Sequence, residues 1–460
     1  MSSLWNSITS GPPGGRASFL SAGKRLDLAE LASASLLADA VDGLRGSRVL
    51  LATRDQYFTA AALVELDGIA RRMILCTPDL DPGRLAEVAA TAQADVVLSE
   101  TSRPEALLPE LPWIVMSRSP TPARIDRAAQ FATEWVLLTS GTTGRPKLVV
   151  HSLESLGGML PRTAAANTVW STFYDIRRYG GLQIYLRAVL GRTPLVLAAT
   201  DESRVDFLAR AAQAGVTHIS GTPSHWRQVL MSGETQLLEP QYVRLSGEIA
   251  EQTVLDQLRA AYPAARVGHA FASTEAGVAF DVDDGRAGFP ADFIDRFDRE
   301  IRLRVVDGTL QVQSPRKALR YLGNDTPIAA APDGYVDTGD FVEGAGDRYY
   351  FRGRRGGVIN VGGLKVYPEE VEAVLNADPR VRMSLVRARR NPITGGIIVA
   401  DVVLRGDGSP AAAPAAAAEL EAQLLDRCRS SLPAHKVPAV LKFVPSLELT
   451  AAGKVVRPGA

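Results

Sequence analysis

The sequence lacks several features that would assign it to a special class of protein. Its two cysteines, Cys76 and Cys428, lie far apart without metal-ligand spacing, and we expect both to be reduced and buried, as in a reducing cytoplasm. The 51 basic residues are balanced by 51 acidic ones, so no overall field favours nucleic acid or an anionic membrane. No stretch approaches the roughly 18 apolar residues of a membrane helix, and no signal peptide is apparent. These absences predict a soluble cytoplasmic protein.

Lysine is also scarce, because nearly all basic residues are arginines. Three of the seven lysines, Lys147, Lys365 and Lys454, lie in segments that resemble binding loops. Where arginine is the usual cation, a lysine in such a loop indicates a need for its compact ammonium group. The distribution therefore directs attention to these three loops.

The length of 460 residues is too great for one hydrophobic core and predicts at least two domains. Helix-like and strand-like segments alternate in the first part of the chain, which predicts a mainly parallel sheet covered by helices. We expect these elements, starting with a helix and alternating with strands, at residues 26–44, 48–52, 57–69, 72–76, 82–92 and 94–98. This region contains no chemical motif and is interpreted as a scaffold.

The first stretch with chemical character follows the apolar run 135–138, which is typical of a buried strand. Hydroxyls, glycines and a lysine come next: Thr139, Ser140, Gly141, Thr142, Thr143, Gly144 and Lys147. The glycines let backbone N–H groups approach a ligand closely. The hydroxyls and the ammonium add donors, and such convergence suits a polyphosphate. The spacing of the ordinary P-loop is absent, so the sequence predicts a different phosphate loop.

This loop resembles the phosphate loop of the ANL adenylating enzymes, which include acyl-CoA and aryl-CoA synthetases, peptide-synthetase adenylation domains and luciferases. Four further motifs follow in the family's order, at residues 267–277, 338–340, 353–354 and 449–457. The resemblance implies an α/β fold with a large N-terminal domain of stacked α/β sheets and a β-rich subdomain. It also implies a small, mobile α+β C-terminal domain. We place the ATP- and acid-binding domain at residues 1–352 and the mobile domain at 353–460.

The motif at 267–277 resembles the family's Tyr-Gly-x-Thr-Glu. The resemblance implies that Phe271 stacks on adenine in place of the tyrosine, and that Ser273 lines the nucleotide site. It further implies that Thr274 bonds the α-phosphate and that Glu275 holds Mg²⁺. In relatives, the turn that corresponds to Gly247 approaches the adenine; here it is followed by Glu248 instead of the usual small residue.

The remaining motifs complete the implied nucleotide and thiol sites. By resemblance, Asp340 accepts the ribose hydroxyls and Arg354 reaches the ribose. The hinge aspartate of the family is replaced by Gly356, which readily absorbs a backbone rotation. The loop that lines the pantetheine path in relatives contributes Gly362, Gly363 and Lys365. Lys454, in the terminal Gly-Lys-x-x-Arg motif, is the implied catalytic lysine.

The acid pocket is expected along an aromatic segment and at the start of a later helix. The candidates are Tyr174, Arg178, Gly181, His225, Trp226 and Ala270. Arg178 stands where many acyl-CoA synthetases have a histidine; either it clamps a second carboxylate or another polar substrate group, or it is a surface charge. Trp226 and His225 either line the pocket or pack in the core.

Two shorter patterns predict local structure outside these motifs. Alternating residues around Asp307-Gly308 suggest a β-hairpin between 301 and 313. The Ala/Pro tract at 411–418 is interpreted as a loop that leads into a helix at 419–432.

The resemblance as a whole implies an acid–thiol ligase that uses ATP, Mg²⁺ and coenzyme A. Such an enzyme converts a carboxylic acid to an acyl-adenylate with release of pyrophosphate, and then transfers the acyl group to coenzyme A. A small or aromatic acid is favoured. The alternative is a stand-alone adenylation enzyme that loads an amino or aryl acid onto a carrier protein, which Asp175 keeps open. A non-catalytic nucleotide-binding protein is a third reading, against which the intact Glu275 and Lys454 argue.

Overall fold

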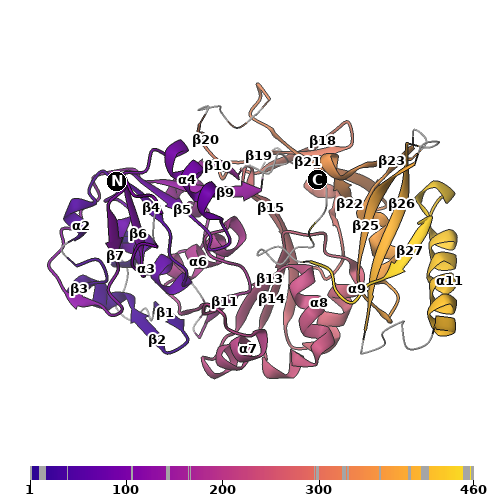
Figure 1. Ribbon diagram of the computed structural model, residues 1–460, viewed down its shortest axis with the longest axis horizontal. Helices are drawn as coiled ribbons and strands as arrows, with labels where there is room; N and C mark the ends of the chain where they lie inside the picture. Colours follow the sequence, from indigo (N-terminus) through magenta and orange to yellow (C-terminus); the bar gives the residue numbers. More distant parts are fainter. Residues whose placement is uncertain are drawn as a thin grey trace.

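A seven-stranded sheet forms the first layer of the molecule (Figure 1). The computed structural model describes residues 3–9, 17–38, 40–104, 107–140, 146–163, 165, 167–294, 296, 300–323, 328, 331–361, 364–391, 395–405, 414–448 and 456. The strand order of this sheet is β20 (Arg320–Tyr321), β10 (Pro146–His151), β9 (Glu134–Ser140), β5 (Arg72–Leu75), β4 (Arg48–Leu51), β6 (Val96–Ser99) and β7 (Trp113–Val115).

The predicted α/β alternation is confirmed in this sheet. Strands β4, β5, β6, β7 and β9 are parallel. Helices α3 (Gln56–Leu66) and α4 (Pro82–Thr91) connect them. Val49 and Leu50 join different core clusters, because adjacent strand residues point to opposite faces. The sheet is therefore buried on both sides, as parallel sheets usually are.

The helix predicted at 26–44 is wrong. The structure has β2 (Lys24–Asp27), a 3-10 turn η1 (Leu28–Ala32), β3 (Ala34–Ser35) and the short helix α2 (Ala40–Gly43) there. The apolar side chains that produced the helical pattern are buried, but by several short elements. The buried Glu65 carboxylate accepts hydrogen bonds from the Ser35 hydroxyl and, at 2.9 Å, from the Leu36 N–H. This tertiary contact fixes the chain in a non-helical conformation.

The second layer is an eight-stranded sheet, separated from the first by helix α6 (Tyr179–Gly191). Its strand order is β16 (Gly277–Val282), β15 (Arg266–Ser273), β14 (Tyr242–Ser246), β13 (His218–Gly221), β11 (Trp170–Thr172), β12 (Leu195–Val196), β1 (Ser18–Ser21) and β2. Side chains of α6, α3 and both sheets share one core cluster. Helix α6 is consequently buried almost all round.

Several helices complete this large N-terminal body (Figure 1). They are α1 (Leu4–Thr9), α5 (Leu153–Gly157), α7 (Arg204–Gln213), α8 (Pro223–Ser232), α9 (Gln252–Ala261) and the 3-10 turn η2 (Glu234–Leu237). A second core cluster packs α7, α8 and α9 on the other face of the eight-stranded sheet. A small ribbon of β3 and β8 (Thr121–Pro122) lies outside both sheets.

The predicted β-rich subdomain is a five-stranded sheet. Its order is β17 (Phe289–Pro290), β22 (Arg348–Arg354), β21 (Val336–Ala345), β19 (Thr309–Gln313) and β18 (Arg302–Val306), with the 3-10 turn η3 (Ala291–Phe293) beside it. The predicted hairpin is confirmed: Asp307 and Gly308 have φ of 50° and 77°, the paired positive values that a tight hairpin turn requires.

The C-terminal part is a small α+β unit with a core of its own. It contains the 3-10 turn η4 (Arg355–Gly357), β23 (Ile359–Val361), β24 (Leu364–Val366), α10 (Pro368–Asn376), β25 (Val381–Asn391), β26 (Gly395–Leu404), α11 (Pro414–Ser431), the 3-10 turn η6 (Ala434–Lys436) and β27 (Val440–Phe443). The loop predicted at 411–418 is corrected, because α11 already begins at Pro414. Proline suits the first helical position, and alanine is the best helix former.

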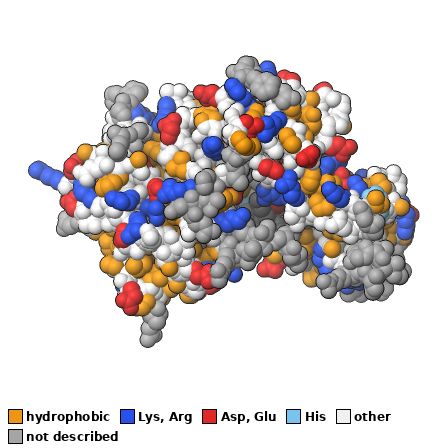
Figure 2. Space-filling view, turned by 90° about the horizontal axis from the view of Figure 1, so that it is seen from above, with side chains coloured by type: hydrophobic (Ala, Val, Ile, Leu, Met, Phe, Trp, Pro, Cys, Tyr) orange, Lys and Arg blue, Asp and Glu red, His pale blue; other side chains and the backbone are white. Residues whose placement is uncertain are grey.

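Figure 2 shows the same division from above, with Lys and Arg side chains around a hollow between the larger and the smaller body. The boundary at 352/353 stays a prediction, since β22 runs through it to Arg354. Cys76 and Cys428 are free and buried, in agreement with the sequence. Within the described ranges, no helix has the length and apolar character needed to span a membrane.

Candidate active site

The predicted phosphate loop connects the antiparallel strands β9 and β10. Thr139 is paired with Lys147, and Ser140 with Pro146, at the end of this hairpin. The residues from Gly141 to Gly144 lie outside the described residues. The strand pairing places Thr139 opposite Lys147 at the end of the hairpin, and the binding of phosphate by this loop stays a prediction.

The Thr274–Glu275 turn joins β15 to β16 and is fixed by two neighbouring segments. His151 Nε2 lies 2.8 Å from the Thr274 carbonyl oxygen, and the Ala318 N–H donates to the Glu275 carbonyl at 2.8 Å. Burial lowers the pKa of His151 to about 4, so the ring is neutral. Its Nε2 carries the proton, because a carbonyl can only accept. Both peptide groups of the turn are thereby oriented.

Tyr321 links the phosphate hairpin to Glu275. Strand β20 pairs with β10, and the Tyr321 hydroxyl donates to Glu275 Oε1 at 3.3 Å. Lys147 Nζ lies 5.5 Å from the centre of the Tyr321 ring. Burial, and then the charge of Glu275, raise the pKa of Tyr321 to about 12, so at neutral pH it keeps the proton that it donates. Sequence reasoning missed Tyr321.

The surroundings of Glu275 fit the magnesium that the resemblance implies. The described residues contain no group of three or more His, Cys, Asp or Glu side chains that could hold a metal. Mg²⁺ in phosphate-transferring sites commonly takes one or two carboxylates and completes its shell with phosphate oxygens and water. The single carboxylate of Glu275, linked to Lys147 through Tyr321, is therefore compatible with an ion that arrives with ATP.

The predicted adenine contacts lie on β15 and on the turn after β14. Phe271 is half-buried and stacks on Phe351, with ring centres 4.8 Å apart, and on Phe280 at 5.7 Å. Gly247 is exposed in a turn with φ of 85°, which favours glycine. Glu248, which follows it, accepts from the Ser224 N–H at 2.9 Å and from the Ser224 hydroxyl at 3.0 Å. It therefore caps helix α8.

The predicted ribose residues face each other across strands β21 and β22. Asp340 and Arg354 are register partners, and Arg354 Nε lies 3.1 Å from Asp340 Oδ1. The Asp340 N–H donates to the Thr338 hydroxyl at 3.1 Å, which closes the turn. Lys365 Nζ lies 5.7 Å from the centre of the neighbouring Phe341 ring. Gly362, Gly363 and Lys454 lie outside the described residues, so their roles stay predictions.

The candidate acid-pocket residues divide into two groups, of which the first contains Tyr174, Ala270, Gly181 and His225. The Tyr174 hydroxyl donates to the Ser246 carbonyl at 2.6 Å, and Ala270 is buried on β15. A Cβ at Gly181 would lie 2.2 Å from the Asp175 carbonyl oxygen, so this position of α6 has no room for a side chain. His225 caps α8 through Nδ1, which accepts the Thr222 N–H at 3.1 Å, and it stacks on Phe173.

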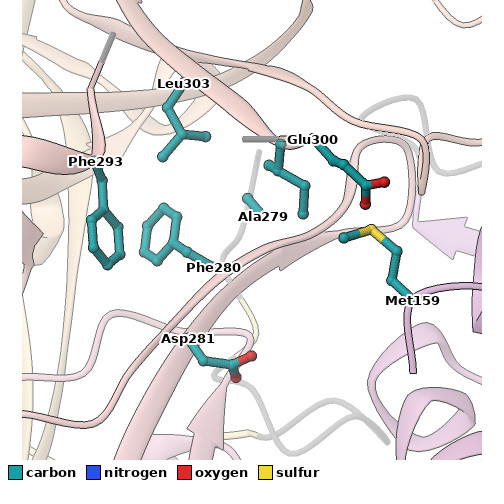
Figure 3. A pocket seen from close by; sticks show the side chains of 8 residues that line it. Met159, Ala279, Phe280, Asp281, Phe293, Glu300 and Leu303 are labelled. Carbon is teal, nitrogen blue, oxygen red and sulfur yellow. The ribbon is translucent and has the colours of Figure 1, made fainter. Parts of the chain in front are cut away.

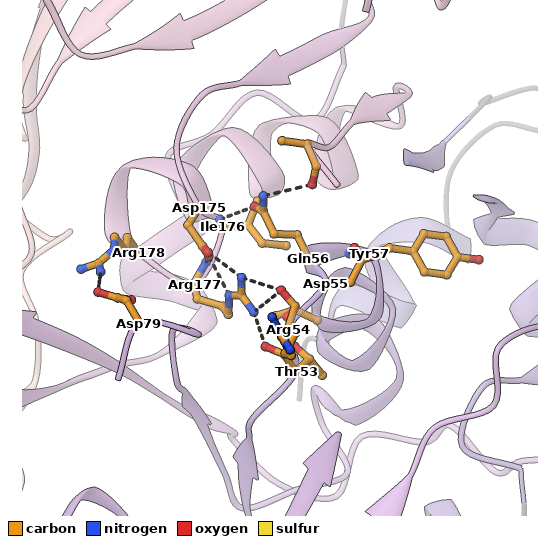
Figure 4. A network of polar contacts seen from close by, with 12 residues as sticks. Thr53, Arg54, Asp55, Gln56, Tyr57, Asp79, Asp175, Ile176, Arg177 and Arg178 are labelled. Atoms are coloured by element: carbon orange, nitrogen blue, oxygen red, sulfur yellow. Dashed lines mark hydrogen bonds and ion pairs between the residues drawn. The ribbon is translucent and has the colours of Figure 1, made fainter. Parts of the chain in front are cut away.

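Trp226 and Arg178 do not support the pocket interpretation. Trp226 is completely buried in the second core cluster, which favours the packed alternative over a place in the pocket wall. Arg178 Nη2 pairs with Asp79 Oδ2 at 2.7 Å (Figure 4). The same view shows Asp175 held by Arg177, whose Nε donates to it at 2.7 Å. Both charges that suggested a particular substrate therefore have partners within the protein.

Comparison with known proteins supplies the family context. A family model named AMP-binding enzyme matches residues 31–318, and the AMP-binding enzyme C-terminal domain matches 370–454. The 2-succinylbenzoate–CoA ligase of Listeria innocua is 27% identical over 346 residues, which cover 71% of this chain and 69% of that protein. The isonitrile lipopeptide synthase of Streptomyces coeruleorubidus is 29% identical over 353 residues, which cover 70% of this chain and 23% of that protein.

The fold is matched over almost the whole chain. The crystal structure of the anthranilate CoA ligase AuaEII in complex with anthranoyl-AMP has a TM-score of 0.79 at 17% identity. The match covers 99% of this chain and 95% of that one. It confirms the predicted α/β architecture with a large N-terminal and a small C-terminal domain.

Proposed function

Because the chain belongs to the AMP-binding enzyme family, we propose that it is an acid:CoA ligase that activates a small or aromatic carboxylic acid through an acyl-adenylate. The observation that carries this proposal is the arrangement around Tyr321. One ring contacts the lysine of the phosphate hairpin and hydrogen-bonds the glutamate of the Thr-Glu turn. A basic group for phosphates and a carboxylate for their metal ion thus meet at one place.

The chemistry explains the need for this arrangement. A carboxylate does not react with a thiol, because oxide is not a feasible leaving group. When the carboxylate attacks the α-phosphorus of ATP, the bond to the bridging oxygen breaks and pyrophosphate leaves. A thiol then attacks the acyl carbon and AMP leaves. The first step brings two anions together, so it depends on positioning and on charge stabilisation.

The proposed roles come from the family resemblance, and the contacts of the described residues among them support it. The hairpin with Thr139, Ser140 and Lys147 would bind the β- and γ-phosphates, and Thr274 would donate to the α-phosphate. A bound Mg²⁺ would neutralise phosphate charge, held by Glu275. Asp340, oriented by its turn and by Arg354, would accept the ribose hydroxyls. Lys454 would stabilise the charge where carboxylate and α-phosphate meet.

Coenzyme A is the proposed thiol, supported by the CoA ligases among the relatives. Loading of a carrier protein is the second candidate, favoured by the similarity to the isonitrile lipopeptide synthase. The argument for an amino-acid substrate is weakened, since Arg177 already neutralises Asp175. We also propose a cytoplasmic location, supported by the two free, buried cysteines.

A release assay tests this proposal. Purified protein with ATP and Mg²⁺ should release pyrophosphate only when a suitable carboxylic acid is added, and should form a thioester when coenzyme A is added. The same reaction with a phosphopantetheinylated carrier protein separates the two acceptors. Absence of acid-dependent pyrophosphate release over a broad panel of acids would refute the adenylating activity.

A further inference from the structure

Strand β10 connects the two segments that we assign to the phosphates. Lys147 of the phosphate hairpin lies at the beginning of this strand, and His151 is its last residue. The His151 ring is completely buried, and its Nε2 lies 2.8 Å from the carbonyl oxygen of Thr274, a residue 123 positions further along the chain. One strand thus links the hairpin directly to the Thr274–Glu275 turn.

A second contact fixes the position of the proton on the His151 ring. Nδ1 lies 3.0 Å from the hydroxyl oxygen of Ser155 in helix α5. Because Nε2 donates to a carbonyl, Nδ1 of the neutral ring can only accept, so the Ser155 hydroxyl donates to it. The Ser152 carbonyl also lies within reach of this hydroxyl, but it already accepts from the Leu156 N–H. The ring is therefore held in one tautomer.

The contact with His151 determines which way the peptide group between Thr274 and Glu275 faces. This group is planar and trans, like nearly all peptide groups, so its carbonyl and its N–H point in opposite directions. The Thr274 carbonyl points to a buried ring, and the Glu275 N–H consequently points to the other side of the turn. Both residues of the turn are only half-buried. A backbone N–H in this position can donate to an anionic oxygen, which is a strong, charge-assisted contact.

Hydrogen bonds are important for this turn because packing beside it is incomplete. Strand β16, which follows the turn, forms one wall of a cavity of about 310 Å³, to which it contributes Phe280 and Asp281 (Figure 3). On the other side, the Ala318 N–H donates to the Glu275 carbonyl at 2.8 Å. The hydrogen bond from His151 fixes the peptide group before it. The orientation of the turn therefore depends on these two contacts.

We propose that His151 is a positioning residue for adenylate formation, which holds the Thr274 carbonyl towards the core and so keeps the Glu275 N–H facing the reacting phosphate. It acts through the turn, since its own ring is completely buried. This inference rests on the proposed function and adds a backbone donor to the groups that bind phosphate. A misplacement of such a group by about 1 Å can cost a factor of about a hundred in rate.

Two amide substitutions separate positioning from mere filling of the core. The amide nitrogen of glutamine can lie near the position of His151 Nε2, whereas that of asparagine lies near Nδ1 and does not reach Thr274. At saturating ATP and Mg²⁺, His151→Asn should lower kcat for acid-dependent pyrophosphate release by about ten- to a hundredfold. His151→Gln should recover most of this loss. The KM for ATP should change little in both variants, because the ribose contact of Asp340 is untouched.

A destabilised protein with an intact turn is the control. Val41→Ala removes buried methyl groups from helix α2, which has no part in the site, and should lower the thermal midpoint while kcat stays near that of the wild type. Ser155→Ala is a milder test, which remains available if His151→Asn does not fold. It should lower kcat in the wild type, where the tautomer depends on this hydroxyl, but much less in His151→Gln, whose amide has no tautomers.

The tautomer also provides a readout that does not depend on turnover. In protein labelled with ¹⁵N-histidine, the signals that disappear in His151→Gln belong to His151, one of five histidines. Burial lowers the pKa of this ring to about 4, so at pH 7 the signals should be those of a neutral ring with its proton on Nε2. Ser155→Ala should change them.

The outcomes distinguish this inference from the proposed function. Equal kcat in His151→Asn and His151→Gln, or a loss no greater than that of Val41→Ala, would show that His151 only fills the core. A proton on Nδ1 in the wild type would equally contradict the contact with Thr274. Each of these results overturns the inference and leaves the proposed function standing. Absence of acid-dependent pyrophosphate release by the wild type refutes the proposed function, and this inference with it.

Discussion

Tyr321 shows how a single side chain can couple two parts of a reaction site. Its ring lies under Lys147, and its hydroxyl donates to Glu275. The hydroxyl orients the carboxylate that we assign to the metal ion. The ring supports the ammonium, because a cation near an aromatic face is attracted by the ring's electron density.

Replacing Tyr321 by phenylalanine separates these two effects. Tyr321→Phe keeps the ring and loses one hydrogen bond, which is worth about 0.5–1.5 kcal/mol. We expect the half-saturating Mg²⁺ concentration to rise about two- to tenfold, with a smaller change in the KM for the acid. Tyr350→Phe, in β22, is the matched control. An unchanged magnesium dependence would contradict the role given to the hydroxyl.

Lys454, near the C-terminus, is the residue whose substitution should affect one half-reaction, adenylate formation, much more than the other. Lys454→Ala should slow adenylate formation by at least about a hundredfold, the scale for one lost transition-state contact. Thioester formation from supplied acyl-adenylate should be largely spared, because the charged transition state of the first step is then bypassed. Lys442→Ala, on the exposed side of β27, serves as the control. Equal loss in both half-reactions would refute the assignment.

At the scale of elements, the end of β22 and the turn η4 join the two bodies of the molecule. Gly353 has φ of 148°, and a Cβ there would lie 2.6 Å from Glu369 Oε2 on α10. Gly356 has nothing within 4 Å of the position of a Cβ. A side chain is therefore sterically hindered at Gly353 but not at Gly356.

Substitution of each glycine by alanine measures the effect of a side chain there on the free energy of unfolding. Gly353→Ala should lower the free energy of unfolding by about 1–3 kcal/mol, from backbone strain and the clash with Glu369. Gly356→Ala should change it by less than about 0.5 kcal/mol, as at other open sites. Urea unfolding of the two variants provides the comparison. Equal stability of the variants would show that the connection adapts freely at Gly353.

At the scale of the whole molecule, a buried carboxyl group joins the N-terminal helix to the core. Asp67 accepts from the Leu4 N–H at 2.8 Å and from the Trp135 indole at 2.9 Å. Burial raises its pKa to about 7, although both hydrogen bonds act in the opposite direction. In the unfolded chain this group ionises near pH 4.

This shift predicts a dependence of stability on pH. Between about pH 4 and pH 7 the native state retains a proton that the unfolded state has lost, so the contribution of Asp67 to stability falls as the pH rises. Asp67→Asn removes this titration. The thermal midpoint of the wild type relative to Asp67→Asn should therefore decrease from pH 4 to pH 7 and level off above it. A constant difference over that range would contradict the raised pKa.

The sequence-based predictions were correct where residues close together in the chain set the structure. The strands around Val49 and Ile74 and the hairpin at Asp307-Gly308 were predicted, because burial pattern and turn chemistry act over a few residues. The helix predicted at 26–44 was wrong because Glu65, far along the chain, binds Ser35 and Leu36. The sequence did not decide whether Trp226 lies in the core or in a pocket, since a large aromatic side chain suits both.

By itself, the sequence determined the family, the α/β architecture and the order of the motifs, because short runs of glycine, hydroxyl and charged residues carry the chemistry of phosphate binding. Only the tertiary structure decided which charges are already paired within the protein, as Arg178 is with Asp79 and Asp175 is with Arg177. The physical reason is that an ion pair or an unsatisfied donor depends on distances between residues far apart in the chain. Strand pairing and helix packing set those distances.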